Sequence, residues 1–117
     1  MKQFLVICLF LSLWACTRST VEPPTGDCVE NVTYSDNVKD ILDNSCAYSG
    51  CHIDNAAPGD YSSYAGLQSS IDNGLLQKRM VELQDMPPIY APDDKPKSLT
   101  EDEIEIISCW VQNEYAE

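Results

Sequence analysis

The sequence predicts an all-α fold for the globular part of this 117-residue chain. Apolar residues recur at the three- and four-residue spacing of a helix in several short segments, and residues that commonly cap helices precede them. Glycine and proline residues separate the segments, and no stretch shows a convincing strand pattern. We therefore expect a small bundle of three to five short helices within residues 32–117.

Residues 1–15 resemble a bacterial lipoprotein signal peptide. Lys2 is followed by an apolar run that ends at Trp14. At about 1.5 Å per residue, this run is too short to span a hydrocarbon core of about 30 Å. Ala15-Cys16 then resembles the end of a lipobox, so we expect Cys16 to be acylated and to become the mature N-terminus. Ordinary signal cleavage nearby is the alternative.

The expected lipid anchor places the protein in the cell envelope, on the inner or outer membrane, facing the periplasm or the cell exterior. Residues 16–31 are polar and contain Pro23-Pro24, so we expect a tether between the lipid and the domain. The chain has 19 acidic and seven basic residues, a net charge of −12. This balance argues against nucleic-acid partners and anionic lipid head groups. It favours a basic docking patch on a partner protein, or it serves solubility alone.

The first helix is expected to begin near Ser35, a candidate N-cap, and to present one apolar face made of Val38, Ile41 and Leu42. It leads into the sequence Cys46-Ala-Tyr-Ser-Gly-Cys51-His52, which contains the only histidine of the chain. Cys-x-x-Cys-His is the attachment signature of c-type haem. Here, two extra residues separate the cysteines, and the flexible Ser49-Gly50 could close the longer loop.

A second helix is expected after Ser62 or Ser63, and Asn73-Gly74 is a typical helix end. Its apolar residues at helical spacing are Tyr64, Leu67 and Ile71. A third short helix is expected over residues 75–83, which are rich in Leu, Met and Val. A proline-containing loop then leads to the last helix.

The last helix has the clearest start signal, because Thr100 and Glu103 form a capping-box pattern. Ile104, Ile107, Trp110 and Val111 are expected to pack on the first helix. At 100° per residue, Cys109 is expected on the opposite, outer face. A segment that carries Cys28 could pass there and form a bridge.

The cysteines allow two pairing schemes. Of the six cysteines, Cys8 lies in the expected signal peptide and Cys16 is the expected lipidation site. Free thiols are disfavoured in the oxidising compartment that an exported chain meets. If Cys46 and Cys51 hold haem, Cys28 and Cys109 are left to form a disulfide. Without haem, the alternative is two disulfides, of which one joins Cys46 to Cys51.

The order of these features resembles class I c-type cytochromes over about residues 32–115. That family places its haem-binding motif after the first helix and a methionine ligand in a loop before the last helix. The resemblance implies one haem c, with Cys46 and Cys51 as thioether positions and His52 as the proximal iron ligand. Trp110 would be the aromatic residue that packs the last helix on the first.

Met86 is the expected second axial ligand, because Met86-Pro87-Pro88 matches a form common at this position in the family. A methionine ligand paired with histidine raises the reduction potential, and two prolines hold the loop extended. Met80 is the rival ligand, although a methionine within a helical apolar stripe more often fills the core. The resemblance also implies that the Pro58 carbonyl accepts a hydrogen bond from His52. Candidate pocket-wall residues are Tyr64, Leu67, Ile71, Leu76 and Val81.

These observations predict a membrane-anchored monohaem cytochrome c that transfers electrons between redox partner proteins. Because His52 and Met86 would occupy both axial positions of the iron, we do not expect an enzyme. The alternative is a cofactor-free, disulfide-stapled lipoprotein that acts as an interaction module. A zinc site built from Cys46, Cys51, His52 and a further cysteine is a third reading, and adjacent Cys51 and His52 converge poorly on one ion.

Overall fold

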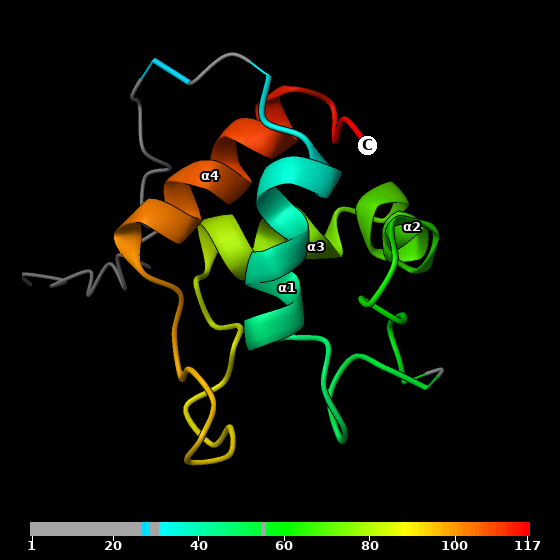
Figure 1. The fold of residues 1–117 in the computed structure, drawn as a ribbon, viewed down its shortest axis with the longest axis vertical. Helices are drawn as coiled ribbons and strands as arrows, with labels where there is room; N and C mark the ends of the chain where they lie inside the picture. Colours follow the sequence, from blue (N-terminus) through cyan, green and yellow to red (C-terminus); the bar gives the residue numbers. More distant parts are fainter. Residues whose placement is uncertain (1–26, 29–30, 55) are drawn as a thin grey trace, which may run out of the picture.

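A computed structural model describes residues 27–28, 31–54 and 56–117, and within these ranges the protein is helical without strands (Figure 1). The all-α prediction is therefore confirmed at the level of fold class. The expected signal peptide, Cys16 and most of the expected tether lie outside the described residues. Within the described part of the chain, no helix is long and apolar enough to cross a membrane.

The first helical stretch consists of a π-helical segment, η1 (Tyr34–Val38), followed by α1 (Lys39–Ser45). Its N-cap is Thr33, whose Oγ1 accepts a hydrogen bond from the Asp36 N–H at 3.2 Å. The prediction of Ser35 as the cap was wrong by two residues, and Ser35 is exposed inside the helix. Asn37 Oδ1 accepts the Thr33 N–H at 3.0 Å, so hydrogen bonds in both directions fix Thr33 at the start.

The second helix, α2 (Tyr64–Asp72), begins as expected after Ser63. Ser63 Oγ accepts a hydrogen bond from the Gly66 N–H at 3.2 Å. The helix ends at Asn73, and Gly74 follows with a φ of 71°, the left-handed conformation that glycine adopts without strain. The expected third helix is present as α3 (Leu75–Gln77) and a second π-helical segment, η2 (Lys78–Glu82).

The last helix, α4 (Glu101–Gln112), starts with the predicted capping box. Glu103 Oε2 accepts the Thr100 N–H at 2.8 Å, and Thr100 Oγ1 accepts the Glu103 N–H at 3.3 Å. Trp110 is fully buried, and its ring lies 6.2 Å from that of Tyr34 in η1. The prediction that Trp110 packs the last helix on the first helical stretch is therefore confirmed.

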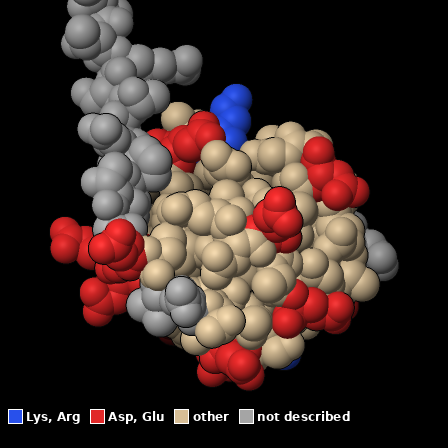
Figure 2. Space-filling model, turned by 90° about the horizontal axis from the view of Figure 1, so that it is seen from above, with Lys and Arg blue, Asp and Glu red and all other residues tan. Residues whose placement is uncertain are grey.

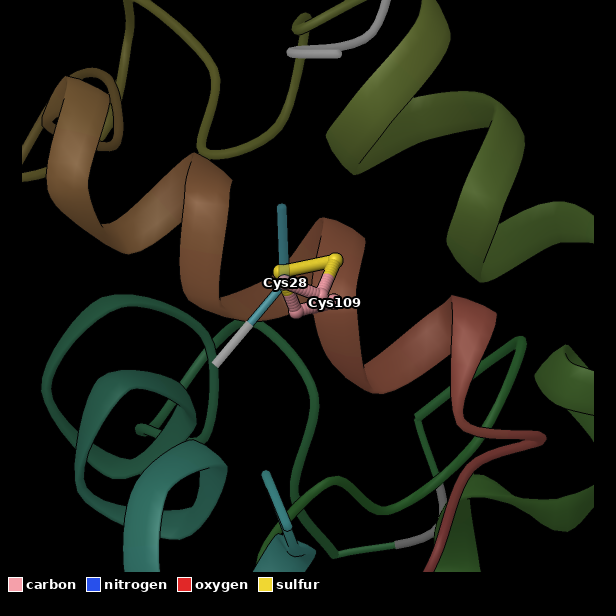
Figure 3. Close-up of a disulfide and its surroundings, with 2 residues drawn as sticks. All are labelled: Cys28 and Cys109. Atoms are coloured by element: carbon pink, nitrogen blue, oxygen red, sulfur yellow. A yellow bond between two sulfur atoms is a disulfide. The ribbon is translucent and has the colours of Figure 1, made fainter. Parts of the chain in front are cut away.

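Cys28 and Cys109 form a disulfide that encloses a sequence separation of 81 residues, as both pairing schemes predict (Figure 3). The expected position of Cys109 on an outer face of α4 was wrong. Its side chain is only 3% exposed and belongs to the hydrophobic core, and Cys28 packs against that core. The bridge is therefore an internal link between the segment before η1 and the terminal helix.

The core lies between η1–α1, α4 and the α2–α3–η2 region. Its fully buried apolar side chains come from all of these elements: Val38, Leu42, Leu67, Leu76, Ile107 and Trp110. Two long connections, residues 46–63 and 83–100, extend from the same end of this helical core (Figure 1). These loops carry most of the residues for which the sequence predicts a function.

Candidate functional site

A cavity of about 500 Å³ lies at the end of the molecule where the two long loops meet. Its wall includes the residues singled out by the sequence, namely Cys46, Cys51, His52, Met80 and Met86. These residues come from the end of α1, the loop behind it, η2 and the loop before α4. The cavity volume falls in the range of about 300–1,000 Å³ that is usual for small-molecule and cofactor sites.

His52 lies at this cavity with its ring stacked on Tyr61. The two ring centroids are 4.2 Å apart, and the ring planes differ by 9°. Burial lowers the pKa of His52, while the Gly59 backbone acts in the opposite direction. The imidazole is therefore neutral at neutral pH, which is the form that binds a metal ion.

Tyr61 is held in place on both sides. Its backbone N–H donates to the His52 carbonyl at 2.7 Å, and its hydroxyl donates to Ser70 Oγ of α2 at 2.8 Å. Both Tyr61 and Ser70 are buried. No sequence signal indicates this pair, because a tyrosine in a loop and a serine nine residues later form no recognisable motif.

The longer cysteine spacing is accommodated by a compact, hydrogen-bonded loop. The Cys51 N–H donates to the Tyr48 carbonyl at 3.0 Å, and the His52 N–H donates to the Cys46 carbonyl at 3.1 Å. Gly50 adopts a φ of 88°, which favours glycine at this turn. Two extra residues therefore leave both thiols and the imidazole on the wall of one cavity.

Cys46 and Cys51 are both free thiols in this structure. Cys46 caps the end of α1 and is 5% exposed, whereas Cys51 is partly exposed. Burial raises the pKa of Cys46 to about 12, so this thiol stays protonated at neutral pH. The short Cys46–Cys51 disulfide of the cofactor-free alternative is not formed.

The two candidate methionine ligands differ in their surroundings. Met80 is 3% exposed and belongs both to the hydrophobic core and to the cavity wall. Met86 is partly exposed and reaches the cavity from the loop, together with Pro87 and Pro88. Met80 therefore has the packing role that is usual for a core methionine.

Buried polar atoms without a hydrogen-bond partner gather at this cavity. Among the described residues there are four such side-chain atoms, and three belong to cavity-lining residues: Ser45 Oγ, Tyr48 OH and His52 Nδ1. An unpaired buried polar group costs about 1–3 kcal/mol, so native proteins keep few of them. The presence of three such atoms at one cavity fits a site that receives a bound group.

Several details of the predicted pocket differ from the structure. Of the candidate wall residues, Leu76 lines the cavity, whereas Leu67 and Val81 are core residues and Tyr64 and Ile71 pack against the core. Tyr64 instead donates its hydroxyl proton to the Tyr115 carbonyl at 2.7 Å. Helical spacing identified their buried face correctly, but it did not distinguish the core from a cavity.

The predicted hydrogen bond from His52 to the Pro58 carbonyl is not formed. Pro58 lines the cavity, but His52 Nδ1 has no hydrogen-bond partner, and the nearby backbone of Gly59 acts only to raise the pKa of the ring. Gly59 lies close to α2, since a Cβ atom built on it would approach the Gly66 carbonyl oxygen to 2.5 Å. Such tight backbone packing explains why glycine occupies this position.

In the described part of the chain, the residues of the zinc alternative are not arranged around one metal position. No group of three or more His, Cys, Asp or Glu side chains is arranged there to hold a metal ion. Cys28 and Cys109, which could have supplied the further thiolate, are bonded to each other.

Comparison with known proteins gave no match from a protein-family model, a curated protein or a solved structure. Function is therefore inferred from the chemistry and geometry of the site.

Proposed function

We propose that this chain is a monohaem c-type cytochrome that carries single electrons. The main support is the convergence of Cys46, Cys51 and His52 on one cavity that also holds two methionine side chains. The unpaired polar atoms on the same wall and the two free thiols fit a covalently held cofactor better than a closed disulfide loop.

Each residue would have a defined part in holding haem c. Cys46 and Cys51 would form the two thioether bonds, and the neutral imidazole of His52 would be one axial ligand of the iron. Met86 would be the other axial ligand, because Met80 is already integrated into the core. When bound, the haem supplies a reversible one-electron couple, and a methionine–histidine ligand pair raises its potential.

The protein matrix would keep this site dry and rigid. Leu75, Leu76 and Pro87 contribute apolar wall surface that excludes water. The Tyr61 ring would hold the imidazole plane, since it stacks on His52 and is anchored to Ser70. Because His52 and Met86 would both bind the iron, no iron position would be left for a substrate, and we propose an electron carrier and not an enzyme.

The proposed cellular setting follows the sequence prediction. Residues 1–15 would be removed as a signal peptide, Cys16 would carry the lipid, and residues 16–31 would tether the domain formed by residues 32–117. This arrangement would keep the cytochrome near redox partners at the membrane of the cell envelope. The Cys28–Cys109 disulfide would join the end of the tether to α4.

A pyridine haemochrome spectrum and an intact mass test the proposal directly. The full chain should be produced in a host with haem c maturation. We expect a c-type absorption band and a mass increase of one haem. A Cys46→Ala/Cys51→Ala variant should lose the covalent mass increase, and His52→Ala should lose normal iron ligation. A colourless parent protein with a Cys46–Cys51 disulfide would contradict the proposal and favour the cofactor-free interaction module.

A further inference from the structure

The two most exposed large apolar side chains lie next to each other on the rim of the cavity. Among the described residues, Ile89 is 84% exposed and Tyr90 is 82% exposed, whereas the next, Leu83, is 40% exposed. Tyr90 also lines the cavity. Adjacent exposed apolar residues beside a candidate cofactor site are typical of a surface that contacts another molecule.

The loop that carries Ile89 and Tyr90 is held by hydrogen bonds on both sides of them. The Ala91 N–H donates to the Pro88 carbonyl at 2.9 Å, and Lys97 Nζ donates to the Ala91 carbonyl at 2.8 Å. Pro87 and Ala91 are themselves buried. The backbone therefore presents Ile89 and Tyr90 outward in a defined conformation, which reduces the entropy that binding would cost.

The charge near this rim differs from that of the rest of the molecule. Residues 78–97 contain four basic residues (Lys78, Arg79, Lys95 and Lys97) and four acidic ones (Glu82, Asp85, Asp93 and Asp94). Arg79 pairs with Asp85 at 2.7 Å, and Lys97 pairs with Asp93 at 3.2 Å. The remaining described residues contain Lys39 as the single basic residue, against 13 acidic ones, of which Asp54 and Asp60 belong to the other cavity loop.

Acidic side chains are spread over the end of the molecule away from the cavity loops. Figure 2 looks onto this end from above the view of Figure 1 and shows many Asp and Glu side chains with little Lys or Arg. Charges further apart than about 8–10 Å are largely screened at physiological salt, so a partner responds to the local charge of the face it meets. The acidic end and the rim, where basic and acidic side chains are mixed, should therefore attract different partners.

We propose that the rim at Ile89 and Tyr90 is the docking surface for the electron-exchange partner, and that this partner protein presents an apolar, charge-poor surface there. The inference rests on the proposed cytochrome function. A partner must approach the cavity because electron transfer weakens steeply with distance. A partner with a basic patch, as the net charge alone would suggest, would be drawn to the acidic end, which is remote from the cavity.

Voltammetry on coated gold electrodes tests whether the apolar rim turns the cavity toward an apolar surface, without knowledge of the partner. The haem-loaded chain would carry Cys16→Ser, because a lipid on Cys16 would itself adsorb to an apolar coating. The electrode coatings would be methyl-terminated and amine-terminated alkanethiol monolayers of equal length. We expect faster interfacial electron transfer at the methyl surface, because the apolar rim places the cavity toward it. The amine surface should bind the protein through its acidic end and give slow electron transfer.

The variant Ile89→Ser should slow electron transfer at the methyl surface by about tenfold, as expected when a central apolar anchor is removed. Because Ile89 does not line the cavity, the haemochrome yield and reduction potential of this variant should match the parent. Leu83→Ser is the matched control, because it removes an exposed apolar side chain that does not line the cavity. It should leave the rate nearly unchanged.

The outcomes separate this inference from the proposed function. A parent chain without haem overturns the proposed function and the docking surface that rests on it. A haem-loaded Ile89→Ser variant with an unchanged rate, or a parent chain with a faster rate at the amine surface than at the methyl surface, overturns the docking surface alone. Binding of a Cys16→Ser chain to phosphatidylcholine vesicles that is lost when Ile89→Ser is added would assign the patch to the membrane and also overturn the docking surface.

Discussion

His52 depends on one neighbouring side chain for its position. Its ring is stacked on Tyr61, and Tyr61 is fixed by a backbone hydrogen bond to His52 and a side-chain hydrogen bond to Ser70. Ser70 is fully buried on α2, so the orientation of the imidazole is set by a helix that is distant in sequence. Tyr61 is therefore a positioning residue for the candidate iron ligand.

Tyr61→Leu should alter the orientation of the His52 ring, whereas Tyr61→Phe should preserve it, because the phenyl ring can still stack. The hydroxyl contact with Ser70 should contribute to stability, so Tyr61→Phe and Ser70→Ala should each lower the free energy of unfolding by about 1–2 kcal/mol. Imidazole NMR signals of the matured protein measure the orientation without ambiguity, because His52 is the only histidine. Unchanged imidazole signals in Tyr61→Leu would refute the positioning role.

Alanine substitutions of Met86 and Met80 can be compared to identify the second proposed iron ligand. In the haem-loaded chain, Met86→Ala should lower the reduction potential and change the visible spectrum, because the proposed thioether ligand would be lost. Met80→Ala should leave the ligand-dependent spectrum unchanged but lower the free energy of unfolding by about 2–5 kcal/mol, since Met80 is a buried core residue. Redox titration and urea unfolding measure the two effects. The reverse pattern would identify Met80 as the ligand.

At the scale of elements, the start of α2 holds the loop that leads away from His52. Gly66 lies in the first turn of α2, and a Cβ atom there would collide with the Asp60 backbone carbonyl. Asp60 itself precedes Tyr61, and its carboxylate accepts a hydrogen bond from the Ser62 N–H at 3.0 Å. The close backbone contact between Gly66 and residue 60 therefore connects the helix to the candidate site.

Gly66→Ala should destabilise the protein by about 1–3 kcal/mol, because the atoms that must move belong to the backbone and cannot rotate away. This loss should occur although alanine is intrinsically the better helix former. Thermal unfolding measures the change, and Ser69→Ala at an exposed position of the same helix is the control. A neutral or stabilising Gly66→Ala would show that the loop shifts freely.

At the scale of the whole molecule, the Cys28–Cys109 disulfide restrains a large part of the chain. The enclosed sequence separation is 81 residues. A loop of this length corresponds to about 4–5 kcal/mol in the chain-entropy model, and measured disulfides typically contribute about 2–4 kcal/mol. The small size of the domain makes such a link important, because small cores leave a narrow margin of stability.

Cys28→Ala/Cys109→Ala should therefore lower the free energy of unfolding by about 2–4 kcal/mol, measured by urea denaturation. Reduction of the parent disulfide should cause a similar loss. The double variant should show no further loss on addition of reductant, which separates the effect of the bridge from that of the two substitutions. Equal stability of the parent in its oxidised and reduced forms would contradict this role.

Local sequence signals predicted the elements well wherever the cause is local. The capping box at Thr100 and Glu103, the cap at Ser63 and the helix end at Asn73-Gly74 all use atoms within a few residues of one another. The first helix was placed correctly, but its cap was not. Both Thr33 and Ser35 carry a suitable hydroxyl, and only the backbone conformation and the reciprocal Asn37 bond select Thr33.

The sequence by itself determined the helical class, the residues that could bind haem and the pairing of Cys28 with Cys109. These features depend on residue type, spacing and order, which can be read along the chain. Only the tertiary structure brought both thiols, His52 and the methionines to one cavity, and only it showed Tyr61, Ser70 and Gly59 around the imidazole. It also showed that Cys109, which was expected on an outer face of the last helix, lies in the core. The physical reason is that burial, ring stacking and backbone approach depend on segments that are distant in sequence and meet only when the chain packs.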